Sequence, residues 1–140
     1  MSGKLTVLDW ATKPDAEWTD DDLASCAKWW AGELNLSSWG LDVRFRPYRD
    51  LDGNWAEMTP HPHYERAEVY VARWSDRYDC DDPAAGDTEV SVVHELVHLR
   101  FWSANSCFDE AGSVTKATYE AAIEKTAQAL VRLRRKSAQQ

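Results

Sequence analysis

Long apolar runs are missing from this sequence, and clustered cysteines are missing as well. Residues 1–10 lack the apolar core of a signal peptide, and no later segment approaches the length of a membrane span. These absences lead us to expect a cytoplasmic protein that makes no membrane contact. The three cysteines, Cys26, Cys80 and Cys107, are widely spaced and odd in number, which favours reduced thiols over a disulfide framework or a CxxC metal site.

Basic residues are also scarce, since the chain has 16 Lys and Arg but 24 Asp and Glu, which gives a formal net charge of −8. Binding to a phosphate backbone needs clustered cations that release counterions, so the composition excludes nucleic acid as an expected partner. The one basic cluster consists of Arg132, Arg134, Arg135 and Lys136, near the end of a predicted helix. Positive charge complements the helix dipole there, and we expect these side chains to be exposed to solvent.

Tryptophan is the residue that this sequence has in abundance, with eight in 140 residues. A chain of this length fits one domain, and 44% hydrophobic with 29% charged residues is typical of a globular protein. Indole rings bury large apolar areas, so we expect these side chains in the core or along a cleft. They are Trp10, Trp18, Trp29, Trp30, Trp39, Trp55, Trp74 and Trp102.

The first part of the chain predicts one helix followed by a small sheet of three to four strands. Thr19 can cap a helix that runs to about residue 34, because acidic residues occupy its first turn and apolar residues recur at helical spacing. Alternation of apolar and polar residues predicts the strands. They are expected over 5–8, 41–46, 55–59 and 67–72, with a loop over 60–62.

Two further helices complete a predicted α+β fold of one domain. After an acidic loop, Asp87 or Thr88 can cap a second helix. Its valines and leucines fall on both sides, with Phe101 in one of the apolar rows, so this helix is expected to be buried. Ser113 can cap the third helix, which runs to the basic cluster.

The buried helix carries His94-Glu95-Leu96-Val97-His98, an HExxH motif. Two histidines four residues apart lie on one face of a helix, so both imidazoles can reach a single zinc ion. Glu95 points about 100 degrees round from His94, where its carboxylate can lie beside the open coordination position and act as a general base. Polar groups inside an apolar helix are costly unless they have partners, and metal binding explains their presence.

A catalytic zinc usually has three protein ligands, so the motif requires a third one. Ala104 stands where the metzincin pattern has its third histidine, which excludes that pattern. Glu120 and Glu124 lie one turn apart on or beside the apolar stripe of the third helix. One of them can bind zinc while the other accepts the outer ring N–H of a zinc-bound histidine. Asp109 and Glu110, in the preceding loop, are alternative third ligands.

The sequence from the motif through the third helix resembles the gluzincins, the thermolysin-like clan of zinc peptidases, in which HExxH is followed by a glutamate ligand on a downstream helix. The resemblance implies that His94, His98 and Glu120 bind zinc and that Glu95 is the general base. It places Glu124 where that clan commonly has an aspartate. The short length is similar to that of mini-gluzincins and small phage or bacterial zincin domains. It implies a zincin-like fold in which the strand before the active-site helix forms the edge that binds an extended peptide.

The sequence therefore predicts a zinc-dependent hydrolase, a peptidase in which a zinc-activated water attacks an amide of a peptide or protein substrate. A group that stabilises the oxyanion is also expected, and the candidates are His61, His63, Arg100 and Tyr119. Two alternatives stay open. One is an interaction or regulatory protein, such as a phage accessory protein, with a structural or vestigial zinc site. The other is hydrolysis of a non-peptide amide or ester.

Overall fold

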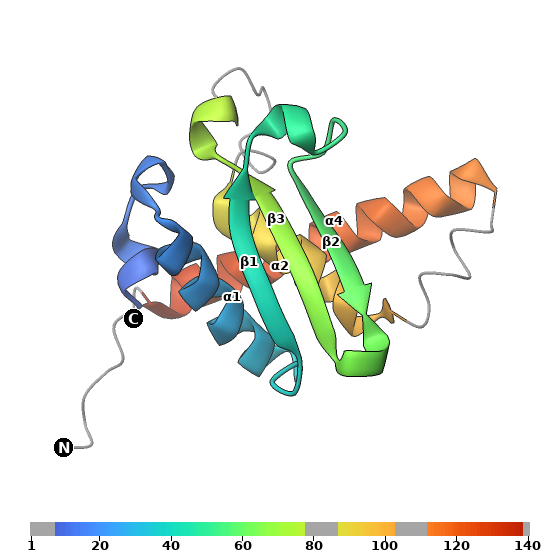
Figure 1. Cartoon of the computed structure of the whole chain (residues 1–140), viewed down its shortest axis with the longest axis horizontal. Coiled ribbons are helices and arrows are strands. Elements are labelled where there is room, and N and C mark those ends of the chain that lie inside the picture. The colour runs from blue at the N-terminus through green and yellow to red at the C-terminus, as the bar shows by residue number, and fades with distance from the viewer. Residues whose placement is uncertain (1–7, 78–86, 103–111, 139–140) are drawn as a thin grey trace.

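The computed structural model describes residues 8–77, 87–102 and 112–138. Over these ranges the chain has an α+β fold, with its longer helices on one face of a small mixed sheet (Figure 1). The strand expected over 5–8, apart from Leu8, lies outside the described residues, as do Cys80, Cys107, Asp109 and Glu110.

The sheet forms the front layer in Figure 1. Its three strands are β1 (Gly40–Arg46), β2 (Ala56–His61) and β3 (Arg66–Ala72). Their order is β1-β3-β2, and β3 pairs parallel with β1 and antiparallel with β2. β3 is therefore central, and the expectation that the strand before the active-site helix forms an edge is wrong. The apolar residues of β3 are buried between its two neighbours, while β2 takes the edge.

The third predicted strand extends further than expected. We expected a loop from Pro60, but β2 continues through Pro60 to His61, and Pro60 lies opposite Ala67 of β3. A proline removes one main-chain donor, which an edge strand tolerates because one of its sides has no partner strand. β1 and β3 each begin one residue before the predicted range and end where the prediction placed them.

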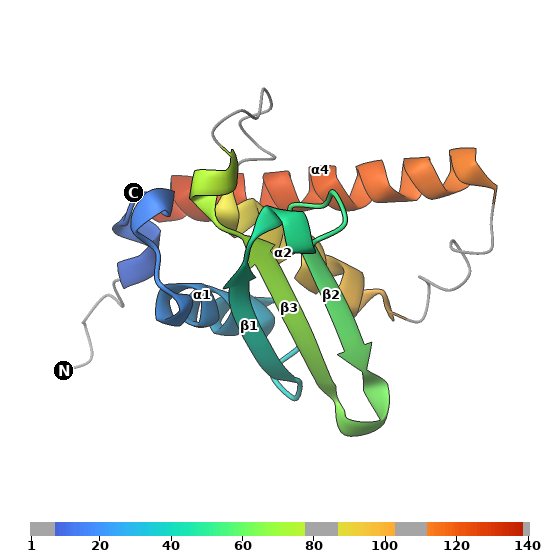
Figure 2. The ribbon, with the colours of Figure 1, turned by 45° about the horizontal axis from the view of Figure 1, so that its top comes forward.

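The three longer helices are α1 (Asp20–Glu33), α2 (Thr88–Arg100) and α4 (Ser113–Ala138). Two of them, α1 and α2, pack on the rear of the sheet, and α4 packs on α2 (Figures 1 and 2). Thr19 caps α1, as the sequence predicts, and it forms a capping box with Asp22. The side chain of Asp87 caps α2. α4 begins at Ser113, so the residue that we expected to cap this helix is instead its first residue. Within the described ranges, no helix combines the length and the apolar character needed to cross a bilayer.

Tryptophan builds much of the core between α1 and the N-terminal segment. The rings of Trp10 and Trp18 meet edge to face at 5.7 Å, and those of Trp29 and Trp30 at 5.0 Å. Trp10, Trp18 and Trp30 are buried, whereas Trp29, Trp39 and Trp55 are half-buried. Trp102 is 40% exposed. The core prediction is thus confirmed for three rings.

Two expectations about individual side chains are wrong. Phe101 is 50% exposed, because α2 ends at Arg100 and Phe101 no longer follows its apolar row. The basic cluster is not wholly solvated: the side chain of Arg134 is only 9% exposed and forms an ion pair with Glu89. Arg134 is buried, and not exposed as expected, because its charge is paired with that of Glu89 on α2.

Candidate metal centre

α2 supplies His94, Glu95 and His98 to the candidate metal centre. The helix is held by apolar side chains that pack against α1, α4 and the sheet. The buried ones are Val90, Val92, Val93, Leu96, Val97 and Leu99. Because these fill most of the helix surface, the two histidines and Glu95 are left half-buried on the side that faces α4 and β2.

α4 places Glu120 and Glu124 opposite the two histidines. Its buried stripe consists of Ile123, Ala127 and Val131. Oε1 of Glu124 accepts a hydrogen bond from Nδ1 of His94 over 2.8 Å, so the expected contact between a glutamate and the outer ring nitrogen of a histidine is present. Oε2 of Glu120 lies 3.1 Å from Nε2 of His98 and 3.6 Å from Nε2 of His94. Glu120 thus faces both imidazoles.

The spacing of these atoms suits a metal ion. One ligand atom each from His94, His98 and Glu120 lie within 4.8 Å of one another. Zinc binds nitrogen and carboxylate oxygen at about 2.0–2.2 Å, and tetrahedral angles then put neighbouring ligand atoms about 3.4 Å apart. The distances of 3.1 and 3.6 Å to Oε2 of Glu120 lie on either side of this value. The three side chains could therefore hold a metal ion, and their nitrogen and carboxylate donors are among those that zinc accepts.

Glu124 fixes the orientation of the His94 ring. Its other oxygen, Oε2, accepts a hydrogen bond from Nε2 of Gln128 over 2.7 Å, so the carboxylate is itself held in place. Burial lowers the pKa of His94, but the hydrogen bond to Glu124 and the nearby carboxylate charges outweigh burial and leave this pKa raised. With Nδ1–H held by Glu124, Nε2 is the ring nitrogen available to a metal.

Glu95 lies between the two histidines along α2 and lines the space beside them. Burial raises the pKa of its carboxyl group. The positive charges of His94 and His98 lower this pKa, and the negative charges of Glu120 and Glu57 raise it, with a net rise. A carboxylate with a raised pKa takes up a proton more readily, which suits a general base close to neutral pH.

Two cavities flank the candidate centre and form a cleft between α2, α4 and β2. Their shared walls are Asn54, Ala56, His94, Glu95 and Glu120. The smaller cavity has a volume of about 250 Å³ and is completed by Gly53, Trp55, Ser91 and Glu124. The larger has a volume of about 510 Å³ and is completed by Glu57, Met58, Pro60, His98, Trp102 and Tyr119. The edge strand β2 borders both.

Of the four oxyanion candidates, the structure brings only Tyr119 to the cleft. Its ring meets that of His98 edge to face, with centroids 5.7 Å apart. His61 lies on the face of the sheet away from the helices, where its Nε2 is 3.7 Å from Glu68. His63 is exposed in a 3-10 helix after β2, and Arg100 is exposed on α2. Neither lines the described walls of the two cavities.

Sequence reasoning missed the wall that β2 contributes. Asn54, Ala56 and Met58 carry no motif, and only the order of the strands brings them opposite α2. It also missed the buried pair of Glu89 and Arg134, although an acidic residue in the first turn of a buried helix was visible in the sequence.

Comparisons with known proteins add no relative. No family model, no curated protein and no solved structure matches the chain.

Proposed function

We propose that this protein is a zinc-dependent peptidase in which His94, His98 and Glu120 hold the metal and Glu95 acts as general base. The observation that carries the proposal is that the three ligand atoms converge in a cleft that Glu95 also lines. A purely structural zinc site has no use for a carboxylate beside the ligands, whereas hydrolysis requires one.

The chemistry of the proposed reaction follows from these roles. His94, His98 and Glu120 would hold a zinc ion, which would supply Lewis-acid chemistry by polarising a substrate carbonyl and lowering the pKa of a water molecule toward neutrality. Glu95 accepts the proton that the attacking water releases and passes it to the departing amine nitrogen. Glu124 keeps Nε2 of His94 directed at the metal position through its hydrogen bond to Nδ1. Tyr119, beside His98, is the candidate donor to the oxyanion.

The edge strand β2 can bind an extended peptide beside the metal position. The carbonyl of Trp55 accepts a hydrogen bond from the N–H of Ala72 in β3 over 2.8 Å, so residue 55 faces β3. Main-chain groups alternate in direction along an antiparallel pair, and those of Ala56 and Met58 therefore point away from β3. The main-chain carbonyl of Pro60 also points away from β3. A docked peptide would thus bond to Ala56 and Met58 by β-augmentation.

The larger cavity offers a mixed wall to a substrate side chain. Met58, Trp102 and Tyr119 contribute apolar surface, while Asn54, Glu57 and the residues of the metal centre contribute polar surface. The cavity therefore favours neither an apolar nor a polar substrate side chain.

The test compares wild type with Glu95→Gln, after both are loaded with zinc, on a diverse peptide mixture whose products are read by mass spectrometry. The amide keeps the shape of Glu95 but cannot accept the proton, so we expect zinc binding to persist and turnover to fall by about 10²–10⁴-fold. Glu17→Gln, an exposed change outside the cleft, is the matched control and should behave as wild type. Zinc binding without wild-type cleavage of any peptide would instead support the interaction protein.

A further inference from the structure

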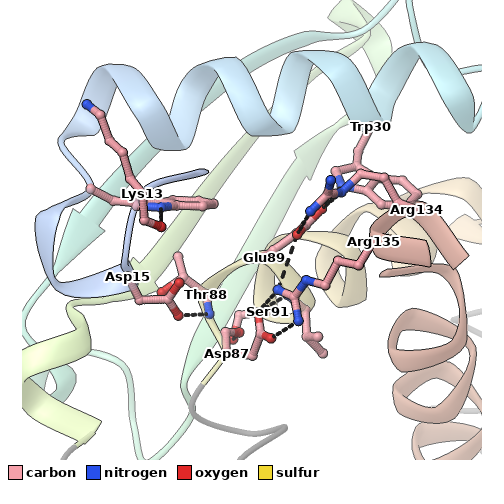
Figure 3. Close-up of polar contacts among 11 residues, drawn as sticks. Lys13, Asp15, Trp30, Asp87, Thr88, Glu89, Ser91, Arg134 and Arg135 are labelled. Atoms are coloured by element: carbon pink, nitrogen blue, oxygen red, sulfur yellow. Dashed lines mark hydrogen bonds and ion pairs between the residues drawn. The ribbon is translucent and has the colours of Figure 1, made fainter. Parts of the chain in front are cut away.

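Glu89 is a buried carboxylate at the start of α2, outside the metal centre. It is 1% exposed and the second residue of the helix. Arg134 of α4 donates two hydrogen bonds to it, from Nε to Oε2 over 2.6 Å and from Nη2 to Oε1 over 2.7 Å. The indole N–H of Trp30 in α1 donates to Oε2 over 2.8 Å. Three helices therefore meet at this carboxylate (Figure 3).

Arg135 extends the same network toward the helix start. Its guanidinium reaches Oε1 of Glu89 over 3.3 Å and Oδ2 of Asp87, the cap of α2, over 2.7 Å. Arg134 also lies over the ring of Trp10, with Cζ 5.1 Å from the centroid. The basic end of α4 is thus joined to the first turn of α2 by several charged contacts.

Stability alone does not explain this arrangement. A buried ion pair gains little over well-packed apolar side chains of similar volume, because both charges lose their hydration. What a charged pair adds is geometry, since a bidentate guanidinium and carboxylate fit in only one relative placement. Buried polar pairs are known to fix the register of packed helices, and that use suits the position of Glu89 and Arg134.

The contacts between α2 and α4 form an ordered series of polar pairs. His98 meets Glu120, His94 meets Glu124, and Glu89 meets Arg134, so α4 runs antiparallel to α2. Between the second and third of these pairs, α4 offers only the aliphatic Ala127 and Val131 as buried residues. Apolar contacts are non-directional, and they leave sliding and rotation of α4 poorly defined.

We propose that the pair of Glu89 and Arg134 sets the register of α4 on α2 and thereby positions Glu120 and Glu124 against the histidines. A slip of α4 by one residue moves it about 1.5 Å along its axis and turns its side chains by about 100 degrees. The rotation turns the Glu124 side chain away from His94 and breaks their hydrogen bond. Glu89 and Arg134 are therefore positioning residues. Their effect on zinc affinity rests on the proposed function, whereas their effect on the contact between Glu124 and His94 does not.

The experiment replaces the charged pair without leaving a lone buried charge. The double variant Glu89→Gln with Arg134→Met removes both charges, and Arg134→Lys keeps the charge but loses the two-pronged geometry. The first readout is the Nδ1–H resonance of His94 in the metal-free, ¹⁵N-labelled protein, which reports its hydrogen bond to Glu124. The second is the zinc dissociation constant from a competition titration.

We expect wild type to show a slowly exchanging Nδ1–H resonance of His94. Both variants should stay helical by circular dichroism, lose that resonance, and bind zinc about 10–100-fold more weakly, the range for lost supporting contacts around a metal ligand. Two controls separate register from general effects. Arg132→Met removes an exposed charge from the same helix end, and Val43→Ala weakens the core on β1. Neither control variant should change the Nδ1–H resonance of His94.

Three results would overturn the proposal. One is a folded double variant that keeps both the resonance and the zinc affinity of wild type. Another is an equal loss in Val43→Ala, which would show that general destabilisation is the cause. The third is a wild-type protein without the resonance. If wild type shows the resonance but binds no zinc, the proposed function is contradicted. The register proposal is then tested by the resonance alone. If the double variant fails to fold, Arg134→Lys decides the question by the same readouts.

Discussion

Glu124 accepts a hydrogen bond from Nδ1 of His94 over 2.8 Å, and this contact joins the two helices that carry the proposed metal ligands. It links residues 30 positions apart in the sequence. A histidine whose Nδ1–H is held in this way presents Nε2 with a fixed direction, which lowers the cost of ordering the ring when a metal binds. The orientation of a proposed metal ligand is therefore fixed by Glu124, a residue that is not itself a proposed ligand.

Removal of this contact should weaken metal binding without abolishing it. We expect Glu124→Ala to raise the zinc dissociation constant about 10–100-fold, as for other lost partners of metal-binding histidines. Competition titration with a chromogenic chelator measures the change. Glu124→Gln is the matched control, because its amide oxygen can still accept the N–H of His94. An unchanged affinity in Glu124→Ala would show that the hydrogen bond has no part in metal binding.

Docking of peptide on β2 can be tested at Met58 without touching the sheet. Met58→Pro removes a main-chain N–H that points to the free edge, and an edge strand tolerates proline. We expect kcat/KM on peptides to fall by about tenfold, the value of a hydrogen bond worth about 1.4 kcal/mol. Met58→Ala shortens the side chain but keeps the N–H, so it separates the two effects. Equal losses in both variants would speak against strand addition.

Cys26 gives a dependence of stability on pH. Its side chain is 0% exposed, and burial raises the pKa of the thiol well above its ordinary value, with the negative charge of Glu89 adding to the rise. The thiol of an unfolded chain ionises near pH 8.5. Above that pH the unfolded state releases a proton that the folded state keeps, so the free energy of unfolding falls, by at most about 1.4 kcal/mol per pH unit.

Denaturant unfolding of wild type and Cys26→Ala between pH 7 and pH 10 measures this effect. The slope of the free energy of unfolding against pH is compared between the two proteins, and the difference between the slopes gives the contribution of Cys26 alone. We expect wild type to lose more stability than the variant as pH rises, and its native Cys26 to resist alkylation at pH 8. Parallel slopes, or rapid alkylation of native Cys26, would be incompatible with a buried, protonated thiol.

The sequence predicts the parts of this fold that depend on local patterns. Thr19 caps α1, and the alternation in 41–46 and 67–72 matches β1 and β3. The spacing of His94 and His98 indicates a shared face before any coordinates are known. The helical spacing of Glu120 and Glu124 made both of them candidate partners of the histidines, and the resemblance to the gluzincins implied Glu120 as the ligand.

Features that depend on pairing between distant segments could not be predicted in this way. No local pattern places β2 beside α2, since strand order is decided by the packing of the whole sheet. Pro60 indicates a loop by its chemistry, yet the edge position makes it acceptable within β2. Arg134 looks like an exposed helix-end residue, and only the approach of Glu89 across 45 positions of sequence explains its burial.

The most direct test of the proposed zinc centre is metal content by elemental analysis, on wild type and Glu120→Ala purified without chelator and then dialysed with zinc. We expect one zinc per wild-type chain. The variant should bind zinc weakly or not at all, because a side chain that faces both histidines is lost. A wild-type protein that takes up no zinc under these conditions would contradict the proposed metal centre, and with it the peptidase.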